Sequence, residues 1–216
     1  MKTITQITVQ QKNKSRSNLF LNGEYYCALD NFTVVKNGLK AGMQIEEEKL
    51  AEIQEESEFS FAFDKLLGYI SKYRKTKKQA LEYLLGKGYT YPVSYKAVDK
   101  VCAYGYLSDD DYAKTYVGDY SRKKGKRLMA LELKNKGVDE KHITAALENV
   151  NEKQSAKDIA IKYMKNKPLD IKTLSKCYRH ILSKGFSYES ASDAISCVKR
   201  IYSENEGEFG DSNGDD

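Results

Sequence analysis

Three stretches of the chain repeat one spacing of apolar and polar residues. Each contains a Lys-Gly-apolar element: Lys87-Gly88-Tyr89, Lys136-Gly137-Val138 and Lys184-Gly185-Phe186. Aligned on these glycines, four registers are apolar in all three copies: Leu84, Leu133 and Ile181; Val98, Leu147 and Ile195; Val101, Val150 and Val198; and Leu67, Tyr116 and Met164. Apolar residues three or four positions apart predict amphipathic helices, and a fixed period predicts tandem repeats. We therefore expect a mainly α protein of three tandem three-helix repeats in an elongated curved array.

The Lys-Gly-apolar element itself predicts the end of a helix. Glycine adopts the left-handed conformation that follows many helices, and lysine suits the negative end of the helix dipole. The apolar residue that follows would pack back onto the helix. We expect a structural role for Gly88, Tyr89, Gly137 and Gly185.

The first 45 residues have a different pattern. Residues 3–9 alternate polar and apolar side chains, which predicts a strand, and residues 18–22 and 24–29 flank the turn signal Asn22-Gly23. Asp30 can cap a short helix over 31–37. The acidic segment 46–58 has only a narrow apolar stripe, which is typical of a loosely packed helix. We thus expect a small N-terminal β-hairpin element.

These patterns divide the chain into six parts. The expected organisation is a β-rich element (1–45), an acidic helical connector (46–58), the repeats (59–107, 108–151 and 152–203), and a disordered acidic tail (204–216).

Charge is distributed unevenly along the chain. The net charge is +5 overall, but residues 60–203 carry a net +13 between acidic ends. Such a basic middle part indicates a polyanionic partner or an acidic protein surface. The four cysteines lack metal-ligand spacing, and no apolar run could span a membrane. We expect a cytoplasmic monomer with reduced thiols and no membrane contact.

The candidate catalytic chemistry is sparse. The two histidines have no recognisable acid–nucleophile arrangement around them, and no glycine loop opens a helix as a phosphate site requires. Asp109, Asp110 and Asp111 could in principle bind a metal, but acids at a helix start are favoured by the dipole. We expect no enzyme activity, cofactor or metal.

Two basic clusters are the candidate contact sites, each at a predicted turn before the second helix of its repeat. Their members are Lys72, Arg74, Lys75, Lys77 and Lys78, and Arg122, Lys123, Lys124, Lys126 and Arg127. They could neutralise nucleic-acid phosphates, meet carboxylates of a protein, or simply face solvent. The third copy departs from this pattern, because Pro168 and Asp170 interrupt its lysines. Tyr73, Tyr104, Tyr106 and Tyr120 lie near the clusters, and we expect most tyrosines to pack in the core.

Three segments together resemble the signature of the RecX family, bacterial regulators of the RecA recombinase. They are residues 84–89 (LLGKGY), 105–113 (GYLSDDDYA) and 132–138 (ELKNKGV). Gly105, Tyr106, Leu107, Asp109, Tyr112 and Ala113 fall on the central motif, for which we expect a structural role. Ser108 stands where the first Asp is often found, and Tyr120 where many members have Arg.

The resemblance implies three tandem three-helix repeats that bind RecA–DNA filaments and modulate, chiefly inhibit, recombinase, ATPase and coprotease activity in DNA repair and homologous recombination. It also implies that some members bind single- or double-stranded DNA, and that none has catalytic residues. Two alternatives remain open from the residues alone: a stand-alone helix-turn-helix-like DNA-binding protein, and a helical scaffold for another acidic protein.

Overall fold

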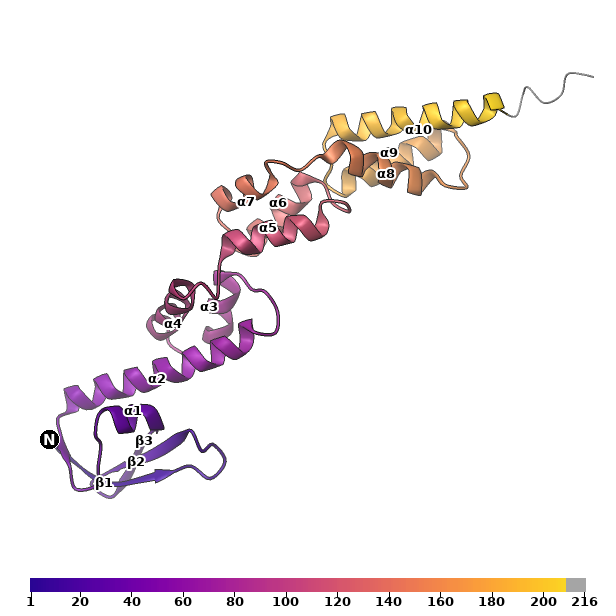
Figure 1. The fold of residues 1–216 in the computed structure, drawn as a ribbon. Coiled ribbons are helices and arrows are strands. Elements are labelled where there is room, and N and C mark those ends of the chain that lie inside the picture. The colour runs from indigo at the N-terminus through magenta and orange to yellow at the C-terminus, as the bar shows by residue number, and fades with distance from the viewer. Residues whose placement is uncertain (209–216) are drawn as a thin grey trace, which may run out of the picture. The chain divides into compact units, whose positions relative to one another are not determined.

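The computed structural model describes residues 1–208, of which residues 205–208 are described only as helical backbone. The chain forms two compact units, Met1–Ser108 and a second that begins at Asp109. The described residues contain four strands and ten helices (Figure 1). Each unit is considered by itself below.

The first unit begins with a four-stranded antiparallel sheet rather than the expected hairpin alone. Its strands are β1 (Lys2–Val9), β2 (Arg16–Leu21), β3 (Glu24–Asp30) and β4 (Gln44–Ile45), in the order β3-β2-β1-β4. The turn between β2 and β3 holds Asn22 and Gly23 at φ of 51° and 91°, as the turn signal predicts. The two-residue β4 pairs with the start of β1, which no sequence pattern indicated.

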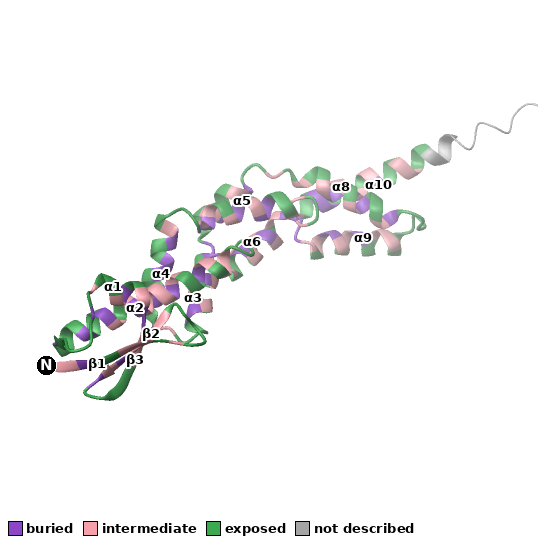
Figure 2. Cartoon of the chain, turned by 60° about the horizontal axis from the view of Figure 1, so that its bottom comes forward, coloured by how far each residue is buried: buried purple, intermediate pink, exposed green. Residues whose placement is uncertain are grey.

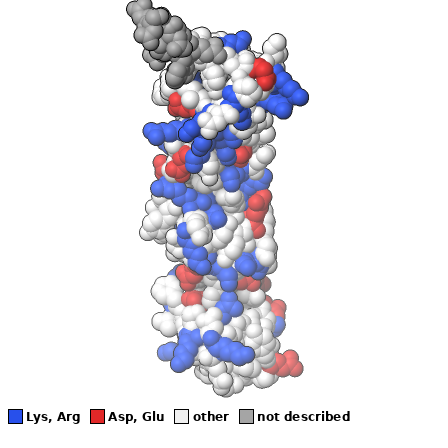
Figure 3. Space-filling model, turned by 90° about the vertical axis from the view of Figure 1, so that its right-hand side faces the viewer, with Lys and Arg blue, Asp and Glu red and all other residues white. Residues whose placement is uncertain are grey.

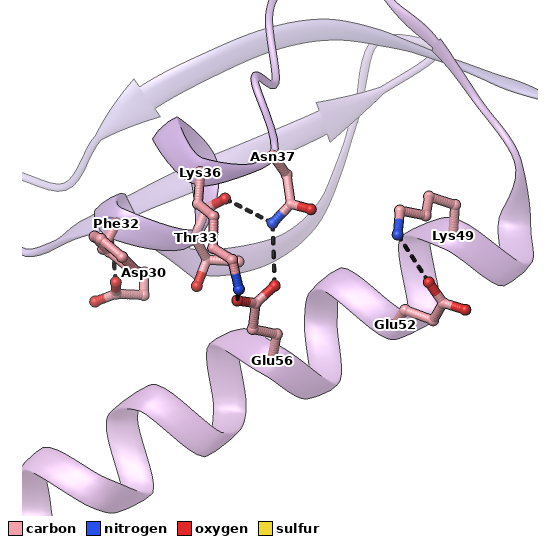
Figure 4. Close-up of polar contacts among 8 residues, drawn as sticks. All are labelled: Asp30, Phe32, Thr33, Lys36, Asn37, Lys49, Glu52 and Glu56. Atoms are coloured by element: carbon pink, nitrogen blue, oxygen red, sulfur yellow. Dashed lines mark hydrogen bonds and ion pairs between the residues drawn. The ribbon is translucent and has the colours of Figure 1, made fainter.

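Helix α1 (Asn31–Lys36) follows the sheet and lies against helix α2 (Glu47–Ile70). Asp30 caps α1 by accepting a hydrogen bond from the Phe32 amide at 2.9 Å. At the other end of α1, Asn37 donates to Glu56 of α2 at 3.1 Å, and Lys36 forms an ion pair with the same carboxylate (Figure 4). These contacts attach α1 to the first half of α2.

Helix α2 corrects the expectation of a loosely packed connector. It runs unbroken through residues 58 and 59, where the sequence pattern predicts a boundary. Leu50 and Ile53 in its first half are 1% and 2% exposed and pack in the core of the sheet. Ala62 and Leu66 in its second half belong to the core of the first helix triplet. One helix therefore serves two cores.

The helices fall into three consecutive triplets, each with a core of its own. In the first unit, α2 packs with α3 (Lys77–Leu85) and α4 (Tyr91–Ala103). The second unit contains the other two triplets: α5 (Asp109–Tyr120), α6 (Lys126–Asn135) and α7 (Glu140–Leu147), then α8 (Glu152–Met164), α9 (Ile171–Ser183) and α10 (Tyr188–Glu208). Buried residues recur along these helices with exposed residues between them (Figure 2).

The aligned apolar registers occupy these cores. The register four residues before the glycines, Leu84, Leu133 and Ile181, is fully buried in all three triplets. The other registers are buried or pack partly buried against the same three cores. Among the described residues, no helix has the length and apolar character needed to cross a membrane.

The Lys-Gly-apolar elements end helices α3, α6 and α9 as the pattern predicts. Gly88, Gly137 and Gly185 have φ of +89°, +83° and +85°, the left-handed conformation. Val138 and Phe186 are 4% and 0% exposed, and Tyr89 packs partly buried against the core of the first triplet, so the apolar residue after each of these glycines does pack back.

The end of the described chain corrects another expectation. Helix α10 continues to Glu208, so the prediction of a disordered tail from residue 204 is wrong for residues 204–208. The remainder of that predicted tail, residues 209–216, lies outside the described residues.

Candidate functional site: the basic turns

The first basic turn joins α2 to α3, and one of its lysines turns inward. The Lys75 ammonium lies 4.9 Å from the ring centre of Tyr69, within cation–π distance. Tyr69 stacks on Tyr83 with 3.9 Å between ring centres, and Lys87 covers Tyr83 at 5.5 Å. Lys75 therefore belongs to a column of two cations and two rings that joins α2 to α3.

The other cations of this turn point to solvent. Lys72 and Arg74 are exposed, as are Lys77 and Lys78 in the first turn of α3, where the Lys78 ammonium lies 4.0 Å from the Glu82 carboxylate. Tyr73 lies beyond the end of α2 and is 74% exposed, so it does not pack in the core as we expect of most tyrosines.

In the second basic turn, between α5 and α6, Lys124 is the inward residue. Its ammonium lies 2.7 Å from Glu132 of α6 and 3.1 Å from the Tyr116 hydroxyl of α5. The ammonium also lies 4.3 Å from the ring centre of Tyr120. Tyr116 completes the set by donating its hydroxyl proton to Glu132. Lys124 thus joins α5 to α6, and its side chain is only 24% exposed.

The electrostatics of this network follow from partial burial and hydrogen bonding. Burial tends to raise the pKa of Glu132, but hydrogen bonds from Lys124 and Tyr116 outweigh it, and the pKa is lowered. Burial and the hydrogen bond to Glu132 raise the pKa of Tyr116 to about 12. The lysine and the carboxylate are therefore both charged at neutral pH, and the phenol is neutral.

The backbone that follows Lys124 docks on the third triplet. The Gly125 amide donates to the Lys184 carbonyl at 2.9 Å, and the Arg127 amide donates to the Gly185 carbonyl at 3.2 Å. The Lys126 amide donates to the carboxylate of Glu152 at the start of α8. These bonds satisfy amides at the start of α6, which lack partners within the helix.

Arg122, Lys123, Lys126 and Arg127 extend from this fixed backbone. Arg122 and Lys123 are exposed, and neither forms an ion pair among the described residues. The Lys126 ammonium approaches the Glu148 carbonyl at 3.4 Å, and the Arg127 guanidinium lies 5.8 Å from the ring centre of Tyr188. The face drawn in Figure 3 shows more Lys and Arg side chains than Asp and Glu side chains.

The third turn, between α8 and α9, shares one feature with the other two. Lys167 lies 3.4 Å from the ring centre of Tyr163, as Lys75 and Lys124 lie over rings of their own triplets. Asp170, which interrupts the basic pattern, caps α9 by accepting from the Thr173 amide at 2.6 Å. Each turn thus has one lysine that lies over an aromatic ring of its own triplet, a role that no sequence pattern indicated.

The central motif divides into buried and exposed residues. Leu107, Asp109 and Ala113 are 5%, 8% and 0% exposed, and Gly105 has φ of +74°. Tyr112 packs partly buried against the core of the second triplet. Tyr106, by contrast, is 63% exposed, which a purely structural role does not explain.

Tyrosine packing also differs from expectation beside this motif. Tyr104 is 53% exposed and lies under the Lys100 ammonium at 5.0 Å, with the Tyr106 ring 5.9 Å away. Tyr73, Tyr104 and Tyr106 are therefore surface residues, whereas Tyr120 packs partly buried as expected.

The acidic start of α5 makes ion pairs. Asp110 lies 2.6 Å from Lys114 and 3.5 Å from His142 of α7, and the hydrogen bond from Lys114 is the main cause of its lowered pKa. Within the described part of the chain, no three His, Cys, Asp or Glu side chains are grouped as a metal site. None of the four cysteines, all in that part, forms a disulfide.

Comparison with known proteins supplies the family. The model described as "Regulatory protein RecX N-terminal domain" matches residues 2–46, and "RecX, second three-helix domain" matches residues 108–147. The second match covers the triplet that contains the Lys124 network.

Relatives and solved structures match over most of the chain. "Regulatory protein RecX" of Clostridium beijerinckii is 34% identical, covering 93% of this chain and 98% of its own, and that of Bacillus subtilis is 29% identical, covering 92% and 78%. A crystal structure of regulatory protein RecX superposes with a TM-score of 0.71 at 22% identity, covering 91% of this chain and all of that one. The RecX of Lactobacillus salivarius gives a TM-score of 0.60 at 23% identity, covering 64% and 95%. The chain therefore belongs to the RecX family of regulatory proteins, which are regulators rather than enzymes.

Proposed function

We propose that this protein binds RecA–DNA filaments and inhibits recombinase, ATPase and coprotease activity, with the exposed cations of the basic turns as contact residues. Family membership along most of the chain is the observation that carries the proposal. We also infer that the three helix triplets are tandem repeats of one unit, so that the first two turns present their basic clusters at equivalent positions.

The candidate contacts separate into two groups by geometry. Lys72, Arg74, Arg122 and Lys123 have exposed side chains, in the turns whose inward lysines are Lys75 and Lys124. Exposed cations of this kind can meet the phosphates or carboxylates of a partner. Lys77, Lys78, Lys126 and Arg127 remain candidate contacts beside them.

Lys75 and Lys124 have a different role in this proposal. Both lie over aromatic rings of their own triplets, and Lys124 is also paired with Glu132. Their proposed role is to position the turns rather than to contact the partner.

Co-sedimentation with RecA filaments, together with RecA-dependent ATP hydrolysis, tests the proposal. Arg122→Glu/Lys123→Glu should weaken filament binding by at least about tenfold, because charge reversal replaces attraction with repulsion. The matched control is Lys141→Glu/Lys176→Glu, which changes the net charge of the same unit equally at exposed positions on α7 and α9. An unchanged ATPase rate and no co-sedimentation of the wild-type protein would refute the proposal.

A binding assay with bare DNA in place of the filament distinguishes contact with the recombinase from contact with DNA. Binding to single- and double-stranded DNA would be measured at two salt concentrations, because phosphate contacts weaken steeply with salt. Filament binding that exceeds binding to bare DNA at the higher salt supports recognition of the recombinase. Sequence-specific duplex binding without RecA would instead favour the stand-alone DNA-binding alternative.

A further inference from the structure

The turn between α5 and α6 borders a cavity, and two of the residues that line it, Arg122 and Lys123, are also proposed filament contacts. The cavity has a volume of about 490 Å³ and lies within the second unit, where the turn faces α8 and α9. Its lining residues are Arg122, Lys123, Asp158, Ile159, Lys162, Tyr163, His180 and Lys184. This volume falls in the range of about 300–1,000 Å³ that is common for small-molecule sites.

Four cations line this cavity. They are Arg122, Lys123, Lys162 and Lys184, and none of them forms an ion pair among the described residues. The single lining acid, Asp158, accepts a hydrogen bond from Gln154 at 2.8 Å. The cavity therefore carries uncompensated positive charge, which favours an anion with more than one charge.

The rest of the lining is apolar and aromatic. Ile159 and Tyr163 come from α8, and His180 comes from α9 with its ring centre 4.9 Å from that of Tyr163. Lys167 fixes Tyr163 from its ring face, and no described residue forms a hydrogen bond with the Tyr163 hydroxyl. An inorganic anion would leave this part of the cavity unused, whereas a planar organic group would fill it.

The two sides of the cavity are held together by backbone contacts. The Gly125 amide donates to Lys184 and the Arg127 amide donates to Gly185, immediately beside the lining residues. Because these bonds join the second triplet to the third, the cations do not have to be brought together when a ligand binds. Such preorganisation lowers the cost of binding.

We propose that this cavity binds a nucleotide, with its phosphates against the four cations and its base against Ile159, Tyr163 and His180. The inference does not rest on filament binding. The nucleotide is a free nucleoside diphosphate or triphosphate. A single strand presents the same phosphate and base chemistry and is the alternative source that the experiment distinguishes.

The two histidines of the chain give a readout that needs no substitution. Burial, with Lys184 and Lys167 nearby, lowers the pKa of His180. A phosphate bound beside His180 would raise that pKa by neutralising the surrounding positive charge. His142 pairs with Asp110 and does not line the cavity, so its resonance is the internal reference.

The experiment uses the full chain with ADP, a tetrathymidylate oligonucleotide and inorganic pyrophosphate as probes. Calorimetry would measure affinity, and NMR would follow the ring protons of the two histidines. We expect ADP to bind and to raise the pKa of His180, while the ring-proton resonances of His142 stay unchanged. Which of the two binds more tightly identifies the source of the nucleotide.

Charge reversal then locates the site. Arg122→Glu/Lys162→Glu should weaken binding at least about tenfold, since two charge-assisted contacts are lost. Lys141→Glu/Lys176→Glu, equal in charge and outside the cavity, should change it less than about twofold. Three results would overturn the proposal: no binding of either nucleotide probe at millimolar concentration, equal losses in both variants, or pyrophosphate binding as tightly as ADP.

Discussion

Gly125 and Gly185 lie backbone against backbone, although 60 residues separate them in the sequence. A β carbon built on Gly125 would lie 2.3 Å from the carbonyl carbon of Gly185, and one built on Gly185 would lie 2.3 Å from the β carbon of Leu128. No real β carbon tolerates such contacts. The second and third triplets therefore meet at a place that only glycine permits on both sides.

Gly185→Ala should destabilise the second unit by more than about 3 kcal/mol, because overpacking adds to the strain of a positive φ. The matched control is Gly88→Ala, where φ is +89° and nothing lies within 4 Å of the added β carbon. That change should cost only about 1 kcal/mol. Denaturant unfolding measures both, and equal losses would show that the close contact does not matter.

Lys124 and Lys123 should respond in opposite ways to substitution. Lys124→Ala removes the ion pair with Glu132 and the contact with Tyr120, and should lower the free energy of unfolding by about 1–2 kcal/mol. Lys123→Ala should stay within about 0.5 kcal/mol in stability.

Filament binding completes the comparison of these two lysines. At a temperature where both variants are folded, Lys123→Ala should weaken filament binding more than Lys124→Ala. The assignment of Lys124 to architecture is wrong if its variant is as stable as wild type and binds filaments less well.

The Glu132 carboxylate should make stability depend on pH in the acidic range. Its folded pKa is lowered below the ordinary value of 4.5, so its contribution is present above about pH 5 and is lost as pH falls through the folded pKa. The stability difference between wild type and Glu132→Gln should therefore shrink as pH falls from about 5 to about 3. A constant difference over this window would contradict the lowered pKa.

Leu50→Ala should cost about 2–4 kcal/mol, because Leu50 is 1% exposed in the core under the sheet. Phe32→Ala on α1 is the contrasting variant, since Phe32 is 70% exposed and should change stability by less than about 0.5 kcal/mol. Thermal unfolding of the two variants would show whether the first half of α2 is core or connector. A small effect of Leu50→Ala would restore the connector interpretation.

The candidate site was only partly predictable from sequence. The clustering of Lys and Arg along the sequence was enough to identify the two basic turns. The clustering could not distinguish Lys123 from Lys124, because the direction of Lys124 depends on the Tyr116 hydroxyl and the Glu132 carboxylate, each eight residues away. Glu132 stands in the motif segment ELKNKGV, so its position was a usable signal, but its partner was not evident.

The sequence by itself determined the helix triplets, the positions of the left-handed glycines and the apolar registers such as Leu84, Leu133 and Ile181. Each depends on local periodicity or on the conformational freedom of one residue, which neighbours along the chain encode. Only the tertiary structure decided that α2 serves two cores, that Lys75 and Lys124 turn inward, and that Gly125 meets Gly185. These features depend on contacts between different helices and turns, and the packing of complete side chains selects them.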